Sequence, residues 1–285
     1  MTVTLRQPTL GDAEVLGDIC YRAFGAIANA HNFPTDFPSP EGTVGLFQHL
    51  IGAGDNFGLV AEADGRIVGS NFLAEQDAIA GVGPITVDPA VQNDGAGRLL
   101  MQAVLERARA KGFAGVRLVQ AGYHSRSLSL YLKLGFEARE HLSCLIGPAI
   151  GESLPGYTVR PAAADDLDAC NAVCFRVHGH ARGGELAGVI AAGSARVVER
   201  AGRITGYATA IAISGHAVGE TTDDLKALIG AADSFRHPGF LVPTRNGELM
   251  RWCLARGLRI TQTLTLMTIG LYSEPAGAWL PSVLF

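Results

Sequence analysis

The sequence predicts an α/β protein that contains two tandem copies of one type of domain. The chain has 285 residues, which suits two domains of roughly 100–150 residues each better than a single core. Segments of the first half recur in the second half in the same order. Within each copy, short β-branched stretches alternate with helical patterns, as in a domain whose helices cover a sheet.

Three pairs of segments carry the repeat. Their members are separated by 154, 137 and 122 residues, in that order along the chain. A constant order with a shrinking separation indicates two homologous copies, the second of them shortened. The aligned segments are 3–24 with 157–178, 65–69 with 202–206, and the region of Gly135 with that of Gly257.

The repeat predicts a first domain over residues 1–151 and a second over residues 157–285, joined by the Leu-Pro-Gly segment between them. Each copy is expected to open with a short strand, a helix that begins at an acidic residue (Asp12 or Asp166), and a hairpin around a Gly-Arg turn. Residues 24–56, rich in Pro and Phe, are expected to form a partly irregular arm over the sheet.

Composition narrows the class of protein. Hydrophobic residues make up 48% and charged residues 18% of the chain, which predicts a folded protein. A net charge of −4 argues against nucleic acid and anionic membranes as partners, and favours a cation such as a free amine. Neither a signal-peptide stretch nor an apolar run of about 18 residues is visible. Five cysteines, an odd number, predict a reducing cytoplasm and no disulfide framework.

A glycine-rich loop is the sharpest local signal. The β-branched strand ending at Val87 stops at Asp88-Pro89, and Gly95 and Gly97 precede an amphipathic helix expected over 98–111. The first N–H groups of a helix lack intrahelical partners, so a loop of this kind can hold a pyrophosphate. Alone, a Gly-x-Gly is more often a plain turn. It is neither a Walker loop nor a complete dinucleotide fingerprint.

A second motif lies downstream, in the segment from His124 to Phe136. Leu128, Tyr131 and Leu134 are spaced for one face of a helix that Gly135 closes. The pattern V-D-P-x-x-Q-x-x-G-x-G-R, followed by S-x-x-L-Y-x-K-L-G-F, resembles the GNAT superfamily of N-acetyltransferases. The resemblance covers most of the first copy.

The resemblance implies a mixed, mostly antiparallel twisted sheet flanked by helices, which splits between the strand ending at Val87 and the one ending near Gln120. Acetyl-CoA would lie there as co-substrate and give its acetyl group, or another short acyl group, directly to an amine acceptor, either a small molecule or a peptide. Tyr131 would protonate the departing thiolate. The residues implied to bind acetyl-CoA are Ile85, Val87, Gln92, Gly95, Ala96, Gly97, Arg98 and His124.

Several points stay open. Tyr131 could instead be a packing residue of its helix. His124 stands where the family often has Asn, and a histidine there could titrate near neutral pH or simply lie exposed in a loop. The general base is not evident, and Glu75, Asp77 and His31 are the candidates. The acceptor, acyl-chain preference and oligomeric state also stay open.

The second copy is expected not to bind acetyl-CoA. Its phosphate loop is missing, Asp223 and Asp224 stand at the corresponding helix start, and Cys253 replaces the tyrosine. No metal site is predicted, because the cysteines and histidines near His178 lack a second paired cluster. The apolar segment 264–285 is expected to pack on the first copy or on a second subunit, so a homodimer is possible. Two alternatives to an enzyme are a non-catalytic acyl-CoA-binding or regulatory module and an interaction protein.

Overall fold

The computed structural model describes residues 2–284, so the chain ends Met1 and Phe285, which bound the two expected domains, lie outside the described residues. The chain divides into two compact units. The boundary between the repeats at residues 151–157 stays a prediction. Among the described residues, the first unit comprises 2–118, Tyr123–Glu137 and Thr268–Gly270, and the second comprises Val119–Gly122, Ala138–Met267 and 271–284.

The first unit contains a mixed sheet in the order β1-β2-β3-β4-β6, with the short strand β5 paired to β3. The β4–β6 pair is parallel, and the β1–β2, β2–β3, β3–β4 and β3–β5 pairs are antiparallel. The expected fold class, mixed and mostly antiparallel, is therefore confirmed. The elements are β1 (Val3–Arg6), α1 (Ala13–Ala30), α2 (Pro40–Gly52), β2 (Asn56–Ala63), β3 (Arg66–Ala74), β4 (Ile79–Val82), β5 (Thr86–Val87), α3 (Ala96–Lys111), β6 (Gly115–Ala121) and α4 (Ser125–Lys133).

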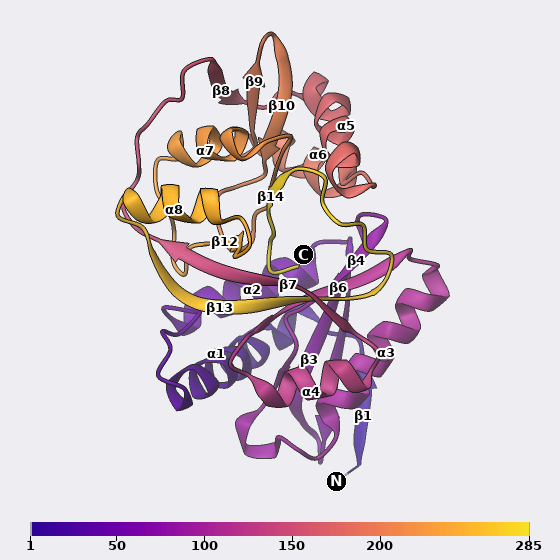
Figure 1. Cartoon of the computed structure of the whole chain (residues 1–285). Helices are drawn as coiled ribbons and strands as arrows, with labels where there is room; N and C mark the ends of the chain where they lie inside the picture. Colours follow the sequence, from indigo (N-terminus) through magenta and orange to yellow (C-terminus); the bar gives the residue numbers. More distant parts are fainter. Residues whose placement is uncertain (1, 285) are drawn as a thin grey trace. The chain divides into compact units, whose positions relative to one another are not determined.

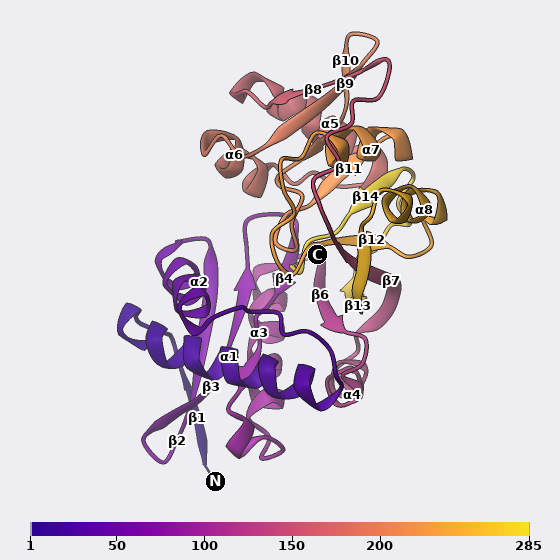
Figure 2. The same cartoon turned by 90° about the vertical axis from the view of Figure 1, so that its left-hand side faces the viewer.

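Helices cover both faces of this sheet. Helices α1 and α2 lie on one side of β1–β4 and α3 lies on the other (Figures 1 and 2). Side chains of a strand alternate between the faces, so Val60 of β2 packs with Leu16, Phe47 and Phe72 in the core under α1 and α2. Helix α3 contributes its own buried row to the opposite face: Leu100, Met101, Val104, Leu105 and Ala108.

The second unit contains a five-stranded antiparallel sheet in the order β14-β11-β10-β9-β8 and a group in the order β13-β7-β12. Val197 and Val198, neighbours on β9, belong to separate cores, as strand alternation requires. Its elements are β7 (Glu137–Ile146), β8 (Tyr157–Pro161), α5 (Leu167–His178), α6 (Gly183–Ala191), β9 (Arg196–Arg200), β10 (Arg203–Ala208), β11 (Ala217–Gly219), α7 (Thr222–Gly230), β12 (Phe240–Pro243), α8 (Gly247–Ala255), β13 (Arg259–Gly270) and β14 (Ala278–Leu280).

The opening of each copy has the same ion-pair bracket. Arg6 of β1 donates to both carboxylate oxygens of Asp12, at 2.8 and 2.9 Å, and its Nε donates to Glu62 of β2 at 2.8 Å. Asp12 therefore joins the first strand to the start of α1 rather than capping that helix, for which it makes no side-chain cap bond. The second copy has equivalent bonds among Arg160, Asp166 and Glu199. This recurrence supports the repeat found in the sequence.

The predicted arm is partly irregular, as expected: residues 31–39 lie outside the helices, and α2 begins where Ser39 accepts the Gly42 N–H at 3.4 Å, with Pro40 in its first turn. Other elements differ from expectation. Helix α3 begins at Ala96, earlier than expected. In the closing segment, Trp279 is 5% exposed and meets the His178 ring edge-on at 5.2 Å, within the second unit. The expectation that this segment is packed is confirmed for this residue, whereas packing on the first copy or on a second subunit stays a prediction.

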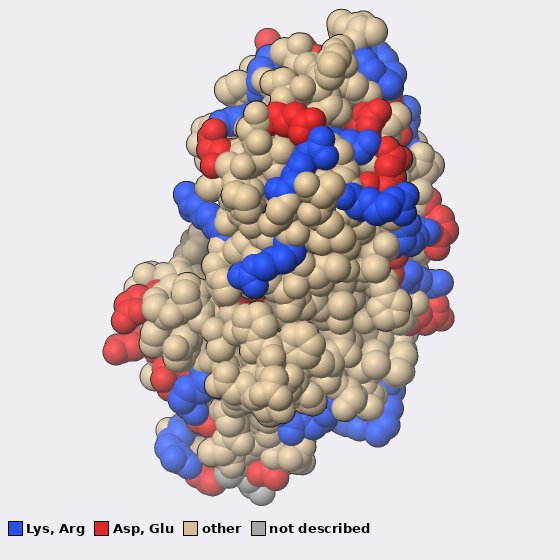
Figure 3. Space-filling model, turned by 60° about the vertical axis from the view of Figure 1, so that its left-hand side comes forward, with Lys and Arg blue, Asp and Glu red and all other residues tan. Residues whose placement is uncertain are grey.

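Charged side chains of both signs are mixed on the surface. On the face drawn in Figure 3, basic and acidic side chains are interspersed between wide uncharged areas, so that face has no continuous basic patch. No helix among residues 2–284 combines the length and apolar character that crossing a membrane would need.

Candidate functional site

The glycine-rich loop starts from a close contact between β3 and β5. Gly69 pairs with Val87, and the N–H of Asp88 donates to the Val68 carbonyl at 2.8 Å. A Cβ atom on Gly69 would lie 2.5 Å from the carbonyl oxygen of Thr86. Only glycine therefore allows β5 to approach β3, and the sequence repeat contains this glycine without revealing its role.

Asp88 fixes the first turn of the loop. Its Oδ1 accepts the Ala90 N–H at 3.0 Å, and both carboxylate oxygens accept from Arg22 of α1, at 3.0 and 3.1 Å. The bonds from Arg22 lower the pKa of Asp88, so the carboxylate stays ionised near neutral pH. Sequence reasoning missed this anchor, although Arg22 is one of the residues that recur between the copies.

The amino terminus of α3 is open. Gly95 takes a left-handed conformation with φ of +93° and supplies no side-chain cap, a conformation that costs other residues roughly 1–2 kcal/mol. The first intrahelical bond runs from Leu99 N–H to the Gly95 carbonyl at 3.0 Å. The N–H groups of Ala96, Gly97 and Arg98 precede it, and the first turn holds no acidic residue. With about half a positive charge from the helix dipole, this end suits an anion.

Gln92 holds the loop together. Its Nε2 donates to the Val87 carbonyl at 3.1 Å, and its Oε1 accepts from Arg126 at the start of α4. Arg126 also donates to Oδ1 of Asn93 at 3.3 Å. The structure thus gives Gln92 a role in shaping the loop, and its predicted contact with a cofactor stays a prediction. One lone pair of the Val87 carbonyl remains for another donor.

The strands diverge where the site was expected. Residues Ile79–Gly81 of β4 pair in parallel with Gly115–Arg117 of β6. Further along, β5 pairs with β3 instead. The half-buried Ile85 lies at this change of partner. The expected split lies between the strand ending at Val87 and the one ending near Gln120, and no pairing of β5 with β6 is found among the described strands.

His124 caps α4. Its Nδ1 accepts the Ser127 N–H at 3.2 Å, and its carbonyl accepts from the Ser127 hydroxyl at 3.0 Å. Half-burial, together with the charge of Arg126, lowers the pKa of His124 below 6.5. The imidazole is therefore neutral at pH 7. The proton must lie on Nε2, since Nδ1 accepts, so the ring retains one N–H donor.

Tyr131 lies in α4 and is 7% exposed. Its ring meets Phe136 at 6.0 Å, edge to face. Burial raises the pKa of Tyr131 to about 12, so the phenol keeps its proton at physiological pH. Both readings of the residue find support here, because the ring packs and the hydroxyl can donate.

An aromatic group next to His124 was missed by sequence reasoning. Phe33 stacks on Tyr123 with ring centroids 4.2 Å apart, and His31, at the end of α1, lies 5.4 Å from Tyr123. The Tyr123 hydroxyl is buried with no hydrogen-bond partner among the described residues. The aromatics of the arm were visible in the sequence, but their partner lies some 90 residues away.

The candidates for a general base differ in their surroundings. Both carboxylate oxygens of Glu75 accept from Arg107 of α3, at 2.7 and 2.9 Å. This ion pair makes Glu75 a poor base. His31 is exposed beside Tyr123, and Asp77 is half-buried in the turn before β4.

In the second copy, side chains of the chain itself cap the amino terminus of α7, the helix that corresponds to α3. Thr221 accepts the Asp224 N–H at 3.4 Å, and Asp224 accepts the Thr221 N–H at 2.8 Å, which forms a capping box on α7. Asp224 is fully buried and also accepts from Thr205. Thus Asp224 turns inward rather than facing a ligand as expected. Cys253, at the position of Tyr131, is buried.

Metal-binding and redox groups are sparse in the described part of the chain. Residues 2–284 contain no cluster of three or more His, Cys, Asp and Glu side chains suited to a metal ion. His178 and His180 stack at 5.8 Å. None of the five cysteines forms a disulfide, and all are buried.

Comparisons with known proteins agree with these observations. Residues 24–136 match the sequence model of the family described as "Acetyltransferase (GNAT) family". The match covers the first copy from α1 to Phe136 and includes the glycine-rich loop and α4. A mycothiol acetyltransferase of Saccharomonospora viridis is 33% identical over 95 residues, which is 30% of this chain and 31% of the relative. The chain therefore spans about a third of the length of that curated relative.

Two solved structures share the fold over nearly the whole chain. A candidate acetyltransferase of Pyrococcus horikoshii has a TM-score of 0.72 at 17% identity and covers 97% of this chain and 94% of its own. A GCN5-related N-acetyltransferase of Sphaerobacter thermophilus has a TM-score of 0.63 at 14% identity, with 95% and 96% covered. At such identities the likeness concerns the fold alone, and it extends through both copies.

Proposed function

We propose that the chain, whose residues 24–136 match the model of the acetyltransferase (GNAT) family, is a member of that family and that its first copy transfers an acetyl group from acetyl-CoA directly to an amine. The open amino terminus of α3 carries this proposal. It combines a left-handed Gly95, uncapped N–H groups and a first turn without acidic residues. A pyrophosphate would supply the acceptors that these N–H groups need.

The chain has fitting places for the rest of acetyl-CoA. Among the described strands β5 pairs only with β3, so the backbone of Ile85 and Val87 can take an extended amide chain on the other edge. The N–H groups of Gly95, Ala96, Gly97 and Arg98 would hold the pyrophosphate. His124 would donate from Nε2. Acetyl-CoA supplies an activated acyl group as a thioester.

Tyr131 is the proposed acid. A phenol with a pKa near 12 is protonated at every physiological pH, so its hydroxyl can donate to a departing thiolate. An exposed thiol has a pKa of about 8.5, and transfer to it from this phenol would be uphill. Burial raises thiol pKa values as well. The transfer therefore requires the sulfur to be as poorly solvated as the ring of Tyr131.

The acceptor is proposed to approach from the side of Tyr123, Phe33 and His31. The aromatic faces suit an organic ammonium ion, which they attract before deprotonation. Among the three candidates for the general base, His31 is the one that is exposed and lies beside Tyr123. The acceptor can be a small molecule or a peptide.

The second copy is proposed to be a degenerate domain without acetyl-CoA. Thr221 and Asp224 already satisfy the start of α7, and Asp223 adds a negative charge there. The protein is proposed to work in a reducing compartment such as the cytoplasm, where five cysteines outside disulfides are stable.

Release of the CoA thiol tests the function. The full chain is mixed with acetyl-CoA and a panel of polyamines, aminoglycosides, amino acids, peptide amines and the amine substrate of the Saccharomonospora viridis relative. Because all five cysteines are buried, a thiol reagent reports mainly released CoA. We expect amine-dependent release and an acetylated product by mass spectrometry. Binding of CoA without release for any amine would favour the non-catalytic module, and no binding would favour an interaction protein.

A further inference from the structure

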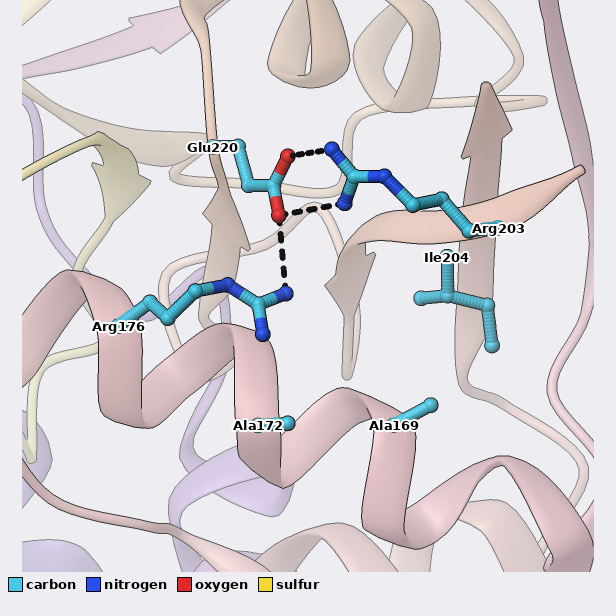
Figure 4. A pocket seen from close by; sticks show the side chains of 6 residues that line it. All are labelled: Ala169, Ala172, Arg176, Arg203, Ile204 and Glu220. Carbon is cyan, nitrogen blue, oxygen red and sulfur yellow. Dashed lines mark hydrogen bonds and ion pairs between the residues drawn. The ribbon is translucent and has the colours of Figure 1, made fainter. Parts of the chain in front are cut away.

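An open cavity lies on the second copy, between α5 and the start of β10. Its volume is about 480 Å³. Figure 4 shows the guanidinium groups of Arg203, from the side of the strand, and of Arg176, from the helix below, meeting at the carboxylate of Glu220, with the apolar side chains of Ala169, Ala172 and Ile204 nearby. The lining residues are Ala169, Ala172, Arg176, Arg203, Ile204 and Glu220.

Cations outnumber anions at this cavity. Arg203 donates to both oxygens of Glu220 at 2.6 Å, and Arg176 donates to one of them at 2.9 Å. Arg200 lies 3.9 Å from the same carboxylate. The buried Asp224 also acts on Arg203, which makes three guanidinium groups against two carboxylates. Arg176 and Arg203 are 51% and 55% exposed, so several of their N–H donors face solvent.

In the equivalent place of the first copy, the number of carboxylates matches the number of arginines. Arg22, the counterpart of Arg176, donates to two carboxylates, Asp18 at 2.8 Å and Asp88 at 3.0 Å. Asp18 corresponds to Ala172. The other counterparts by sequence are Val15 for Ala169, Ala63 for Arg200 and Arg66 for Arg203. Asp88 corresponds to Glu220 by its backbone, because the two N–H groups donate to the carbonyls of the counterparts Val68 and Thr205. The second copy therefore lacks the carboxylate on the helix, because Ala172 stands in place of Asp18, and it has the additional guanidinium of Arg200. Two larger side chains of the floor, Val15 and Asp18, are replaced by alanine.

From these three changes we propose that the cavity binds a small organic anion, a carboxylate or a phosphate ester with an apolar body. The fork of an arginine matches the oxygens of either group. The apolar body would lie on Ala169, Ala172 and Ile204. This site is separate from the acyl-transfer site and rests on no part of the proposed function.

A small molecule fits better than a macromolecule. The volume lies within the range of roughly 300–1,000 Å³ typical of small-molecule sites. The positive charge is confined to three side chains around Glu220, whereas an acidic peptide or a nucleic acid needs an extended basic surface. The alanine floor also offers apolar contact at the bottom of the cavity, which a bare inorganic ion would not use.

Amide NMR of the full chain tests the proposal with three probes: phenyl phosphate, benzoate and inorganic phosphate. We expect saturable shifts at α5 and β10 with phenyl phosphate, benzoate or both, and binding weaker by about tenfold for inorganic phosphate, which lacks the apolar body. Which aromatic probe binds more tightly identifies the anionic group. The experiment omits acetyl-CoA, so its result is independent of catalysis.

The variant Ala172→Asp restores the carboxylate of the first copy. It should form an i,i+4 pair with Arg176, which favours the helix, and weaken binding of the aromatic anion by about tenfold or more. Arg200→Ala should weaken binding as well. Ala187→Asp, on an exposed position of α6, is the matched control and should change nothing. The proposal is overturned if neither aromatic anion saturates, if inorganic phosphate binds as tightly as the aromatic anions, or if Ala172→Asp binds like the wild type.

Discussion

The imidazole of His124 accepts the backbone N–H of Ser127 at 3.2 Å, and this bond begins α4. In the second copy Asn246 caps α8 in the same way, accepting the Leu249 N–H at 3.1 Å. The two capping residues are 122 residues apart, as are the glycines that follow their helices. A histidine can take this place only while Nδ1 is unprotonated.

The cap predicts the effect of two substitutions. His124→Ala should lower the free energy of unfolding by about 1 kcal/mol, the usual value of a lost helix cap. His124→Asn should be nearly neutral, because asparagine can make the bond that Asn246 makes. Urea unfolding at pH 7.5 measures both. Equal losses for the two variants would show that the cap has no energetic role.

The same bond makes stability depend on pH. The folded-state pKa of His124 lies below its unfolded value of about 6.5. Below pH 6.5 the unfolded chain takes up a proton that the folded chain does not, so this contribution to stability is complete above that pH and declines as the pH falls towards the folded pKa. The wild type should therefore lose more stability than His124→Asn between pH 7.5 and 5.5. Parallel losses would contradict this assignment.

Tyr131→Phe tests the acid. The change should lower kcat by roughly 10²–10⁴-fold, the scale of general-acid catalysis, and leave acetyl-CoA binding almost unchanged, because the ring and its contact with Phe136 remain. Single-turnover kinetics isolates the chemical step. Tyr157→Phe in the second copy is the control and should turn over normally. If the single-turnover rate of Tyr131→Phe stays within about threefold of that of the wild type, far less than general-acid catalysis contributes, Tyr131 is a packing residue only.

Gly97→Glu tests the anion site at α3. A Cβ atom at this position would lie 3.6 Å from Cγ2 of Val87, an ordinary contact, so Gly97→Ala should fold and bind acetyl-CoA. The glutamate would place a negative charge at the helix start and should remove measurable binding. Gly188→Glu, where a Cβ meets open space, controls for the added charge. Unchanged affinity in a folded Gly97→Glu protein would be incompatible with pyrophosphate at this helix.

The two ion-pair brackets should be similar in strength. Asp12→Asn and Asp166→Asn each weaken hydrogen bonds to an arginine, and each should cost about 1.5–3 kcal/mol. Asp18→Asn, at a largely exposed pair, should cost at most about 1 kcal/mol. Arg6 lowers the folded pKa of Asp12, so its contribution is present above the unfolded value of about 3.9 and is lost as the pH falls below it. Urea unfolding measures these free energies. If Asp12→Asn and Asp166→Asn each lose no more stability than Asp18→Asn, the two ion-pair brackets do not stabilise the fold as proposed.

The sequence predicted those parts of the site that depend on residues close together in the chain. The start of α3 and the closure of α4 follow from glycines at fixed places, and a single sequence reveals both. The bond between Arg22 and Asp88 joins residues 66 apart, and the stack of Phe33 on Tyr123 depends on the path of the arm. Such contacts are created by the folded sheet. They could not be predicted from spacing, although the recurrence of Arg22 as Arg176 marked one of the residues.

Calorimetric titration of acetyl-CoA into the full chain tests the central claim most directly. The account places one open helix start in the first copy and a capped one in the second. It therefore predicts one binding site per chain, which Gly97→Glu removes. Two sites per chain, or one site that survives Gly97→Glu, would contradict it.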